Sequence, residues 1–325
     1  MMTKTLLAAF LTCFLFSSCG EKEEPKPAIK SLTLGPVPAS AVEEFSGQKA
    51  YDHIAALTKF GPRPPESEGY RKSLNYLETE LKNLGWTTKR ANFKAQSPAG
   101  PIRFTNLLAR YGESDSIKWK QSPPYVLSGH LDSKRYLDKT FLGVNDSGSS
   151  TGVILEMARV LSKYPDAARQ VELVFFDGEE AILENIVVTG PQADGLYGST
   201  NYAKNRLRNR QSKPKLAFVL DLVGDPSVDL FVSAHTDKAA RKEGLKAVKT
   251  LDLYEKITFP NLYITDDHVP LMEYARLPVF HLIGDFQSMP YWHKEGDTMD
   301  TIKPEALENT GKFTLQVLHQ LTTPK

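Results

Sequence analysis

The chain has 325 residues, of which 41% are hydrophobic and 24% are charged, an ordinary globular composition with enough chain for one large domain or two small ones. Its 40 basic and 39 acidic residues leave a net charge of +1. This balance gives no electrostatic basis for binding nucleic acid or an anionic membrane surface, so we expect neither interaction.

The first 18 residues have the layout of a secretory signal. Lys4 precedes an apolar stretch at 6–16, which is too short to span a bilayer in a mature protein. The following "FSSC" resembles the lipobox of bacterial lipoproteins, in which the cysteine, here Cys19, is lipidated and becomes the first mature residue. We therefore expect a signal peptide at 1–18 and an exported lipoprotein held by its lipid on the periplasmic or surface face of the cell envelope. A plain cleaved signal with an incidental cysteine is the alternative.

Residues 19–45 are rich in Glu, Lys, Pro and Ser, and we interpret them as the lipidated cysteine with a flexible tether. Cys13 and Cys19 are the two cysteines of the sequence, and processing would remove Cys13. The domain at 46–325 therefore has no disulfide and no thiolate metal site, so any metal must be held by His, Asp and Glu. Membrane contact is expected through the lipid alone.

The elements of the domain alternate between helix and strand. Amphipathic helical patterns at 51–60 and 67–84 come first, separated by "GPRPP", and Gly85 ends the second. Strand-like runs follow at 86–93, 102–111, 125–130, 171–178, 216–224, 230–235 and 278–284, with helical patterns at 152–164, 197–208, 236–249 and 303–321. Several strands are almost continuously apolar, as in sheets that are covered on both faces. The sequence predicts a single α/β domain with a central mixed β-sheet flanked by helices on both faces.

Polar residues gather where several of these strands end, in "SGHLDS", "FFDGEE", "VLDLVGD" and "FHLIGDFQSMPYWH". In α/β sheets, ligands bind beyond the carboxyl ends of the strands. The candidate site residues are His130, Asp132, Asp146, Glu179, Glu180, Asp221, Asp266, His268 and His293. His281, inside an apolar strand, is expected to be buried and hydrogen-bonded near the site.

Carboxylates and imidazoles without thiolates suit a catalytic zinc site with an open position. Crowded carboxylates raise one another's pKa unless a divalent cation offsets the repulsion. From residue types alone, two interpretations remain: a metal site, or an acidic turn satisfied by hydrogen bonds.

Five motifs occur in order: "HLDS", "NDSGSSTGVILEMARVL", "FFDGEEA", "LYGS" and "YWHKEGDT". In this order they resemble the zinc-dependent exopeptidase superfamily, which includes bacterial leucyl aminopeptidases and has an α/β/α sandwich fold. Within it, the chain more closely resembles the glutaminyl-peptide cyclotransferases of animals and their bacterial relatives. The residues that carry this closer resemblance are the full "FFDGEEA", "LDLVG", "DDHVPLM", "PVFHLI" and the Trp before the last His. The resemblance runs from about residue 45 to the C-terminus.

This resemblance implies one Zn²⁺ per chain, bound by Asp146, Glu180 and His293. It implies that Glu179 is the general acid/base and that Asp221 and Asp266 hydrogen-bond to each other or to the substrate amine. It also assigns Trp292, Thr265 and Phe286 to the substrate pocket. The implied reaction cyclises the N-terminal Gln of peptides or proteins to pyroglutamate and releases ammonia. We assume a monomer.

The chain departs from the animal cyclases in places. They carry a Trp shortly after the Glu pair, where this sequence has Ile182, Leu183 and Asn185 in a longer loop, so one wall of the pocket is left unassigned. Thr265 replaces a larger polar residue, and the segment from Gly284 to His293 is longer and differently ordered. The disulfide of the animal enzymes cannot form.

Two other functions remain open at this point. A dinuclear zinc aminopeptidase of the same fold would use His130 and Asp221 as further ligands and a metal-bridged hydroxide, and the sequence retains both residues. A catalytically inactive lipoprotein that binds peptides or a partner protein would have lost a zinc ligand, yet all three are present. The roles of His130 and Asp132 stay unassigned.

Overall fold

The structure is a computed structural model that describes residues 34–190 and 192–324. The expected signal peptide, Cys19 and the first part of the expected tether lie outside the described residues. Where the structure describes the chain, no helix combines the length and the apolar character needed to cross a membrane.

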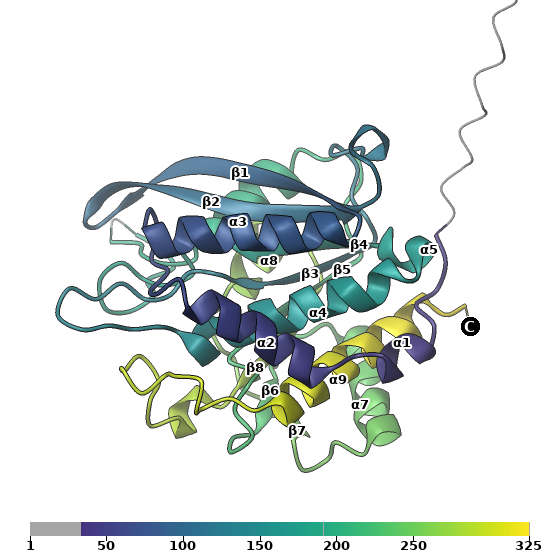
Figure 1. Ribbon diagram of the computed structural model, residues 1–325. Coiled ribbons are helices and arrows are strands. Elements are labelled where there is room, and N and C mark those ends of the chain that lie inside the picture. The colour runs from purple at the N-terminus through teal and green to yellow at the C-terminus, as the bar shows by residue number, and fades with distance from the viewer. Residues whose placement is uncertain (1–33, 191, 325) are drawn as a thin grey trace, which may run out of the picture. The chain divides into compact units, whose positions relative to one another are not determined.

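Eight strands form one mixed sheet in the order β1-β2-β4-β3-β5-β8-β6-β7 (Figure 1). Their bounds are β1 Trp86–Ser97, β2 Gly100–Tyr111, β3 Tyr125–His130, β4 Val171–Phe176, β5 Leu216–Asp221, β6 Leu230–Val232, β7 Ile257–Thr258 and β8 Val279–Gly284. The strands β4, β3, β5 and β8 run parallel in the middle of the sheet, and β2 and β6 join them antiparallel on either side. The carboxyl ends of four central strands therefore meet at one edge of the sheet.

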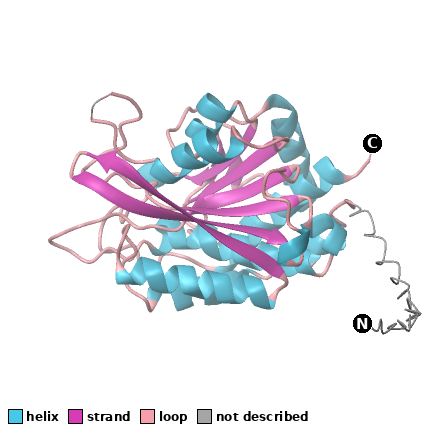
Figure 2. Ribbon diagram, turned by 90° about the horizontal axis from the view of Figure 1, so that it is seen from above, coloured by secondary structure: helices cyan, strands magenta, loops and turns pink. Residues whose placement is uncertain are grey.

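Helices cover both faces of this sheet (Figure 2). The α-helices are α1 Ser40–Glu43, α2 Gly47–Thr58, α3 Glu68–Asn83, α4 Ser150–Ser162, α5 Pro165–Ala168, α6 Tyr197–Asn201, α7 Lys238–Leu251, α8 His268–Ala275 and α9 Pro304–Thr322. Two π-helical turns, η2 Val144–Ser149 and η3 Tyr202–Leu207, and two 3₁₀ turns, η1 Ser114–Ser116 and η4 Phe286–Ser288, complete the described elements. The predicted α/β class, with a mixed sheet between helices, is confirmed.

Alternation along the strands explains why both faces are apolar. On β3 and β4, Leu127 and Leu173 belong to the larger core under α2, α4 and α9, whereas Val126 and Val174 belong to the core under α8 and η3. Since successive side chains of a strand point to opposite faces, a strand buried on both sides must be apolar throughout. This is the pattern that the sequence shows.

The folded domain begins earlier than residue 46, the boundary that the sequence predicts. Val37, Ala41 and Phe45 are buried in the larger core, and the backbone of Val37 is hydrogen-bonded to Thr322 and His319 of α9. These apolar side chains are spaced among Pro and charged residues, so the segment looks like a tether in the sequence although it packs on the C-terminal helix.

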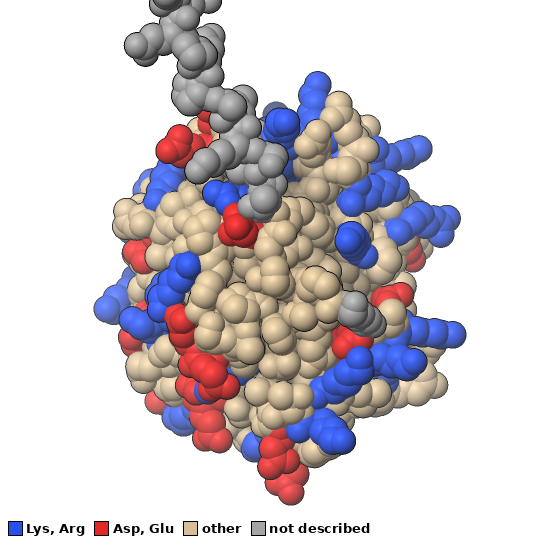
Figure 3. All heavy atoms as spheres, turned by 90° about the vertical axis from the view of Figure 1, so that its right-hand side faces the viewer, with Lys and Arg blue, Asp and Glu red and all other residues tan. Residues whose placement is uncertain are grey.

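The surface carries both signs of charge. On the face shown in Figure 3, basic and acidic side chains surround a largely uncharged centre. This agrees with the near balance of 40 basic and 39 acidic residues in the sequence.

Candidate metal and substrate site

A cavity of about 300 Å³ opens at the carboxyl ends of β4, β5 and β8. Its lining combines the acidic turn after β4, the end of β5, the segment before α8 and the segment after β8, and includes Asp146, Glu179, Glu180, Asp221, Leu222, Thr265, Asp266, Ile283, Phe286, Trp292 and His293. Six of the nine candidate site residues therefore line one cavity, at the place where α/β sheets bind ligands, whereas His130, Asp132 and His268 are not among its lining residues.

Asp146, Glu180 and His293 come together in the lining of this cavity. Their potential ligand atoms all lie within 4.8 Å of one another, with His293 Nε2 3.4 Å from Asp146 Oδ2 and 3.3 Å from Glu180 Oε2. Glu180 Oε1 is buried and has no hydrogen-bond partner. This unpaired, buried carboxylate oxygen lies beside the carboxylate of Asp146 and the imidazole nitrogen of His293. Such a set of donors fits a divalent cation such as Zn²⁺.

Two other aspartates hold these ligands in place. Asp297 accepts the backbone N–H of Asn145 at 2.7 Å and that of Asp146 at 3.0 Å, which fixes the irregular turn at the start of α4. Asp132 accepts the N–H groups of Glu179 at 3.2 Å and Glu180 at 3.3 Å. The sequence left Asp132 unassigned, and the structure shows that it anchors the backbone of the Glu pair.

Gly178 explains why a glycine must precede the Glu pair. Its φ is +72°, in the left-handed region, and a Cβ there would lie 2.4 Å from the ring of Phe104. The chain can therefore turn sharply from β4 only with Gly at this position, and this turn brings Glu179 and Glu180 to the cavity.

Glu179 is buried and lines the cavity beside the three candidate ligands. Burial raises its pKa well above the ordinary value, and the neighbouring Asp266 and Glu180 add to the effect. Burial likewise raises the pKa of Asp221 to about 7. A cavity lined by carboxyl groups with raised pKa values can exchange protons with a bound ligand.

His130 joins a second group of potential ligands with Asp146 and Asp221. Its Nε2 lies 3.3 Å from Asp146 Oδ1 and 3.3 Å from Asp221 Oδ1. Burial alone would lower the pKa of His130, but the surrounding aspartates outweigh burial and raise the pKa well above the ordinary value. Asp146 is common to both groups, which is the arrangement that two neighbouring metals would need. Asp221 is hydrogen-bonded to His130, and none of the described hydrogen bonds joins it to Asp266.

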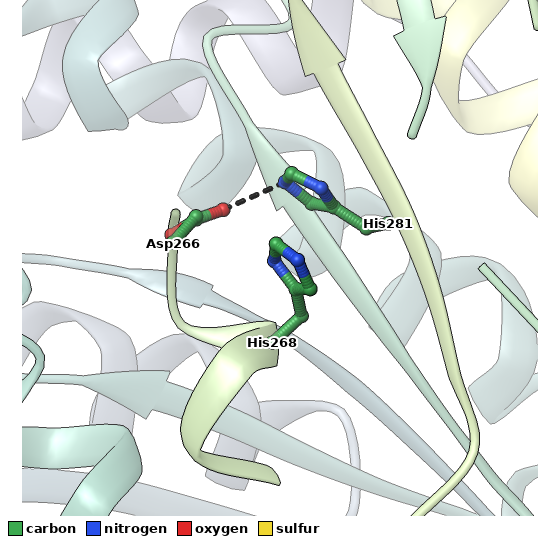
Figure 4. Close-up of side chains that lie close together, drawn as sticks. All are labelled: Asp266, His268 and His281. Atoms are coloured by element: carbon green, nitrogen blue, oxygen red, sulfur yellow. Dashed lines mark hydrogen bonds and ion pairs between the residues drawn. The ribbon is translucent and has the colours of Figure 1, made fainter. Parts of the chain in front are cut away.

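Asp266, His268 and His281 form a third cluster (Figure 4), of which Asp266 lines the cavity. His281 Nε2 lies 2.8 Å from Asp266 Oδ2, and His281 Nδ1 lies 3.0 Å from Ser233 Oγ. The rings of His268 and His281 are stacked, with centroids 3.9 Å apart and planes at 21°. The lone pair of an imidazole nitrogen lies in the plane of its ring, and two stacked, nearly parallel planes do not converge on one ion. We therefore interpret this cluster as a hydrogen-bonded support for Asp266. His281 is buried and hydrogen-bonded, as predicted.

The predicted pocket residues line the cavity as a connected wall. Trp292 stacks on His293 with centroids 4.3 Å apart, and Phe286 packs against Trp292 at 4.8 Å. Thr265 lines the same cavity. The longer loop after the Glu pair contributes Glu184, Asn185 and Ile186, so it occupies the wall that the sequence left unassigned.

Three further residues contribute to the site and were not predicted from the sequence. Lys134, in "HLDSK", is buried with its Nζ 3.5 Å from Glu180 Oε2 and 3.1 Å from the carbonyl oxygen of Ala181. Asp297 lies inside the "YWHKEGDT" motif, which could have drawn attention to it. Asp194 supports the loop after the Glu pair by accepting the backbone N–H groups of Ile182 and Leu183, and no sequence signal indicates this role.

Comparisons with known proteins identify the family and the fold of the chain. The profile of peptidase family M28 matches residues 106–318. The chain is 27% identical to a glutaminyl-peptide cyclotransferase-like protein of Bos taurus, over 88% of this chain and 79% of that protein. It shares its fold with glutaminyl cyclase of Porphyromonas gingivalis, with a TM-score of 0.75 and 22% identity over 86% of this chain and 99% of that one. It also shares it with a Zn-dependent exopeptidase of Parabacteroides distasonis, with a TM-score of 0.73, 22% identity and the same coverage of both chains.

Proposed function

The chain belongs to peptidase family M28, and we propose that it is a zinc-dependent glutaminyl-peptide cyclotransferase that converts the N-terminal Gln of peptides or proteins to pyroglutamate and releases ammonia. The observation that carries the proposal is the meeting of Asp146, Glu180 and His293 beside Glu179 in one cavity. Similarity to named glutaminyl-peptide cyclotransferases over most of the chain supports the same reaction.

Asp146, Glu180 and His293 would hold a single Zn²⁺. The chemistry that such an ion would supply is that of a Lewis acid toward the γ-carbonyl of the substrate Gln. The unpartnered Glu180 Oε1 and the mixed carboxylate and imidazole donors are what this ion requires from the protein.

Glu179 then moves the proton. It accepts a proton from the α-amine of the substrate as this nitrogen attacks the γ-carbon, and it returns that proton to the departing amide nitrogen. One C–N bond forms and one C–N bond breaks, so the products are a five-membered lactam and ammonia. Asp221 and Asp266, which line the same cavity, hold the amine in position.

The apolar wall fixes the geometry of ring closure. Because both reacting groups belong to one Gln residue, the protein needs mainly to hold that residue in the rotamer that closes the ring. Phe286 packs on Trp292, and Trp292 stacks on His293, so the two aromatic rings present a preorganised surface that would exclude water from the side chain of the substrate.

The test is to incubate the purified protein with matched peptides that begin with Gln or Leu. We expect the Gln peptide to lose the mass of one ammonia and the Leu peptide to stay unchanged. Release of free Leu without cyclisation of the Gln peptide would contradict the proposal.

One observation favours a second candidate, a dinuclear aminopeptidase. His130 Nε2 lies 3.3 Å from both Asp146 and Asp221, so the donors for a second metal are in place. This candidate expects two metal equivalents and release of the first residue from a Leu peptide.

We also propose that the mature protein is a monomeric lipoprotein anchored through Cys19 to the bacterial cell envelope. The basis is the signal-like segment at 1–18 and the "FSSC" that ends in Cys19. In a bacterial host, Cys19→Ala should move the protein from the membrane fraction to the soluble fraction, and retention in the membrane fraction would contradict the anchor.

A further inference from the structure

Resting on the proposed lipid anchor at Cys19, we propose that one edge of the domain is a docking surface for an anionic lipid bilayer. Five exposed basic residues form this surface, which we call the basic edge: Lys118, Lys120, Arg208, Lys213 and Lys215. The near-zero net charge led us to expect membrane contact through the lipid alone, but net charge does not describe where the charges lie.

Two stretches of the chain carry basic residues and no acidic ones. Residues 195–220 contain six Lys and Arg and no Asp or Glu, and residues 116–131 contain Lys118 and Lys120 and no Asp or Glu. The exposed acids Glu113 and Asp115 lie just before the second stretch, and they are too few to cancel the five charges of the basic edge. Clustered Lys and Arg attract anionic lipid even on a protein of almost no net charge.

The fold places these two stretches side by side. The N–H of Gln211 donates to the carbonyl oxygen of Lys120 at 2.7 Å, and the N–H of Lys215 donates to that of Pro124 at 2.6 Å. The stretches lead directly into β5 and β3, which are parallel neighbours in the sheet. Their basic side chains therefore share the edge at which the central strands begin.

The charges of the basic edge are not neutralised by carboxylates. None of its five residues belongs to an ion pair in the described part of the chain, whereas the neighbouring Arg110 and Arg210 are both paired with buried Glu172. Lys213 Nζ donates to the carbonyl oxygen of Ala275 at 3.1 Å, which leaves its positive charge in place. The edge thus presents unpaired positive charge to solvent.

The described chain begins at the same edge. Gln170, the residue before β4, donates from its side chain to the carbonyl oxygen of Gly35. The carbonyl oxygen of Gln170 accepts the N–H of Tyr125, the first residue of β3, at 2.9 Å. Figure 1 shows the described chain beginning on the right-hand side of the molecule, and Figure 3 shows that side, with basic side chains along one border.

The length of the chain before this point keeps the edge close to the bilayer. Cys19 lies 15 residues before Leu34, a distance of at most about 50 Å. A lipid on Cys19 therefore attaches the domain by the edge that carries the unpaired basic residues. Charge complementarity and the position of the anchor both favour an anionic bilayer as the partner.

Docking by this edge orients the active site. The candidate metal and substrate cavity opens at the carboxyl ends of β4, β5 and β8, whereas the basic edge lies at the amino ends of β3 and β5. Because these strands are parallel, the two features are at opposite edges of the sheet. A domain docked by the basic edge presents its cavity to peptides in solution.

The attraction is electrostatic and therefore sensitive to salt. Each Lys or Arg close to an anionic bilayer strengthens binding about fivefold, and the attraction fades within about 10 Å at 0.1 M salt. A salt wash should thus release a protein held by charge alone, whereas a lipid anchor resists it. The fractionation of Cys19→Ala accordingly includes a wash at high salt.

The experiment measures how the unlipidated mature chain, which begins at residue 19 and carries Cys19→Ser, cosediments with lipid vesicles. At low salt we expect binding to vesicles of phosphatidylcholine mixed with phosphatidylglycerol, and none to vesicles of phosphatidylcholine alone. Added salt should release the protein. In the double variant Lys120→Glu and Lys215→Glu, the partition coefficient should fall at least about tenfold, because two attractive charges become repulsive.

A matched double variant, Lys59→Glu and Lys94→Glu, makes the same change of net charge at the opposite edge. Both side chains are exposed. Lys94 pairs with Arg103 in the β1–β2 hairpin, which extends past the carboxyl end of β4. Lys59 closely precedes Arg63, whose side chain donates to the carbonyl oxygen of Leu131, just beyond the end of β3. This variant should bind the vesicles like the native chain.

A charge-conserving variant tests whether charge is the cause. Lys120→Arg with Lys215→Arg should keep native binding, and equal urea midpoints for all variants would establish that each is folded. Cyclisation of a Gln-initiated peptide should continue at an unchanged rate when the protein is bound to vesicles. Loss of cyclisation on the vesicles would place the cavity at the bilayer and overturn the orientation.

The remaining outcomes concern the docking surface itself. No binding at low salt, equal binding to neutral and anionic vesicles, or equal losses in the two Glu variants would overturn it. Binding of double-stranded DNA without binding of anionic vesicles would assign the edge to nucleic acid and overturn it as well. Cosedimentation needs neither the lipid nor catalysis, so a failure of the anchor or of cyclisation shows separately, in the fractionation or in the peptide assay.

Discussion

At the residue scale, the three carboxylates of "FFDGEEA" have different environments. Asp177 Oδ2 accepts the N–H of Thr105, Glu179 faces the cavity, and Glu180 lies against His293 with one oxygen unpaired. Sharp backbone turning at Gly178 allows neighbouring acids to point to different partners. A short acidic run can therefore supply both a proton-transfer group and a metal ligand.

This division of roles predicts that substitutions of neighbouring residues have different effects. Glu179→Gln should lower kcat by at least about 10²-fold, because the proton acceptor is lost, while the zinc content stays unchanged. His293→Ala and Glu180→Ala should lose zinc along with activity. Peptide cyclisation rates and elemental analysis of each variant measure the two effects. A fully active Glu179→Gln protein would show that another group moves the proton.

His53 gives a pH dependence that is separate from the site. Burial lowers its pKa from 6.5 to about 4, and its Nδ1 lies 2.7 Å from the hydroxyl of Tyr76. Because the pKa is lower in the folded than in the unfolded state, the unfolded chain binds the extra proton between pH 6.5 and 4. Stability is therefore lost as the pH falls through this window, by on the order of 2 kcal/mol for this one group.

Urea unfolding at several pH values measures this contribution. His53→Gln keeps a polar side chain but does not titrate, so its free energy of unfolding should fall less steeply between pH 6.5 and 4 than that of the native protein. Identical pH profiles for the two proteins would show that His53 is not responsible.

At the scale of elements, the loop after the Glu pair depends on Asp194. In Asp194→Ala, the N–H groups of Ile182 and Leu183 lose their acceptor, so we expect faster amide hydrogen exchange at 182–187. We also expect a lower kcat/KM, since the same segment continues from Glu180. Asp194→Asn keeps one acceptor oxygen and should lie between the native protein and Asp194→Ala. Unchanged exchange in Asp194→Ala would mean that other contacts hold the loop.

Most long elements could be predicted from the sequence because their periodicity is strong. The predicted helix at 67–84 corresponds to α3 Glu68–Asn83, with Ser67 as its N-cap, and the predicted strand at 125–130 coincides with β3. The eight-residue helix α8 and the two-residue strand β7 were not predicted, since such short segments hardly show a period.

The grouping of the three candidate ligands could be anticipated from motifs, but the residues that support them could not. Asp146, Glu180 and His293 carry recognisable neighbours in the sequence, and their side chains do meet in the structure. The contacts of Lys134 with Glu180 and of Asp194 with Ile182 depend on the path of two loops. Loop paths are set by tertiary packing, which local patterns do not encode.

At the scale of the whole molecule, residues 34–45 belong to the folded domain. Phe45 packs so closely on α9 that a Cβ at Gly311 would lie 2.1 Å from its ring. A chain that begins at residue 46 should therefore be less stable than one that begins at residue 34, by several kcal/mol, because Val37, Ala41 and Phe45 leave the core. Urea unfolding compares the two chains, and equal midpoints and slopes would show that the segment adds nothing to stability.

The most direct test of the central claim is zinc titration of the metal-depleted protein, with cyclisation of a Gln-initiated peptide as the readout. Activity should be absent after chelation, return in proportion to added Zn²⁺ and reach its maximum at one equivalent per chain. A maximum that needs two equivalents, or full cyclisation by the metal-depleted protein, would contradict a single zinc held by Asp146, Glu180 and His293.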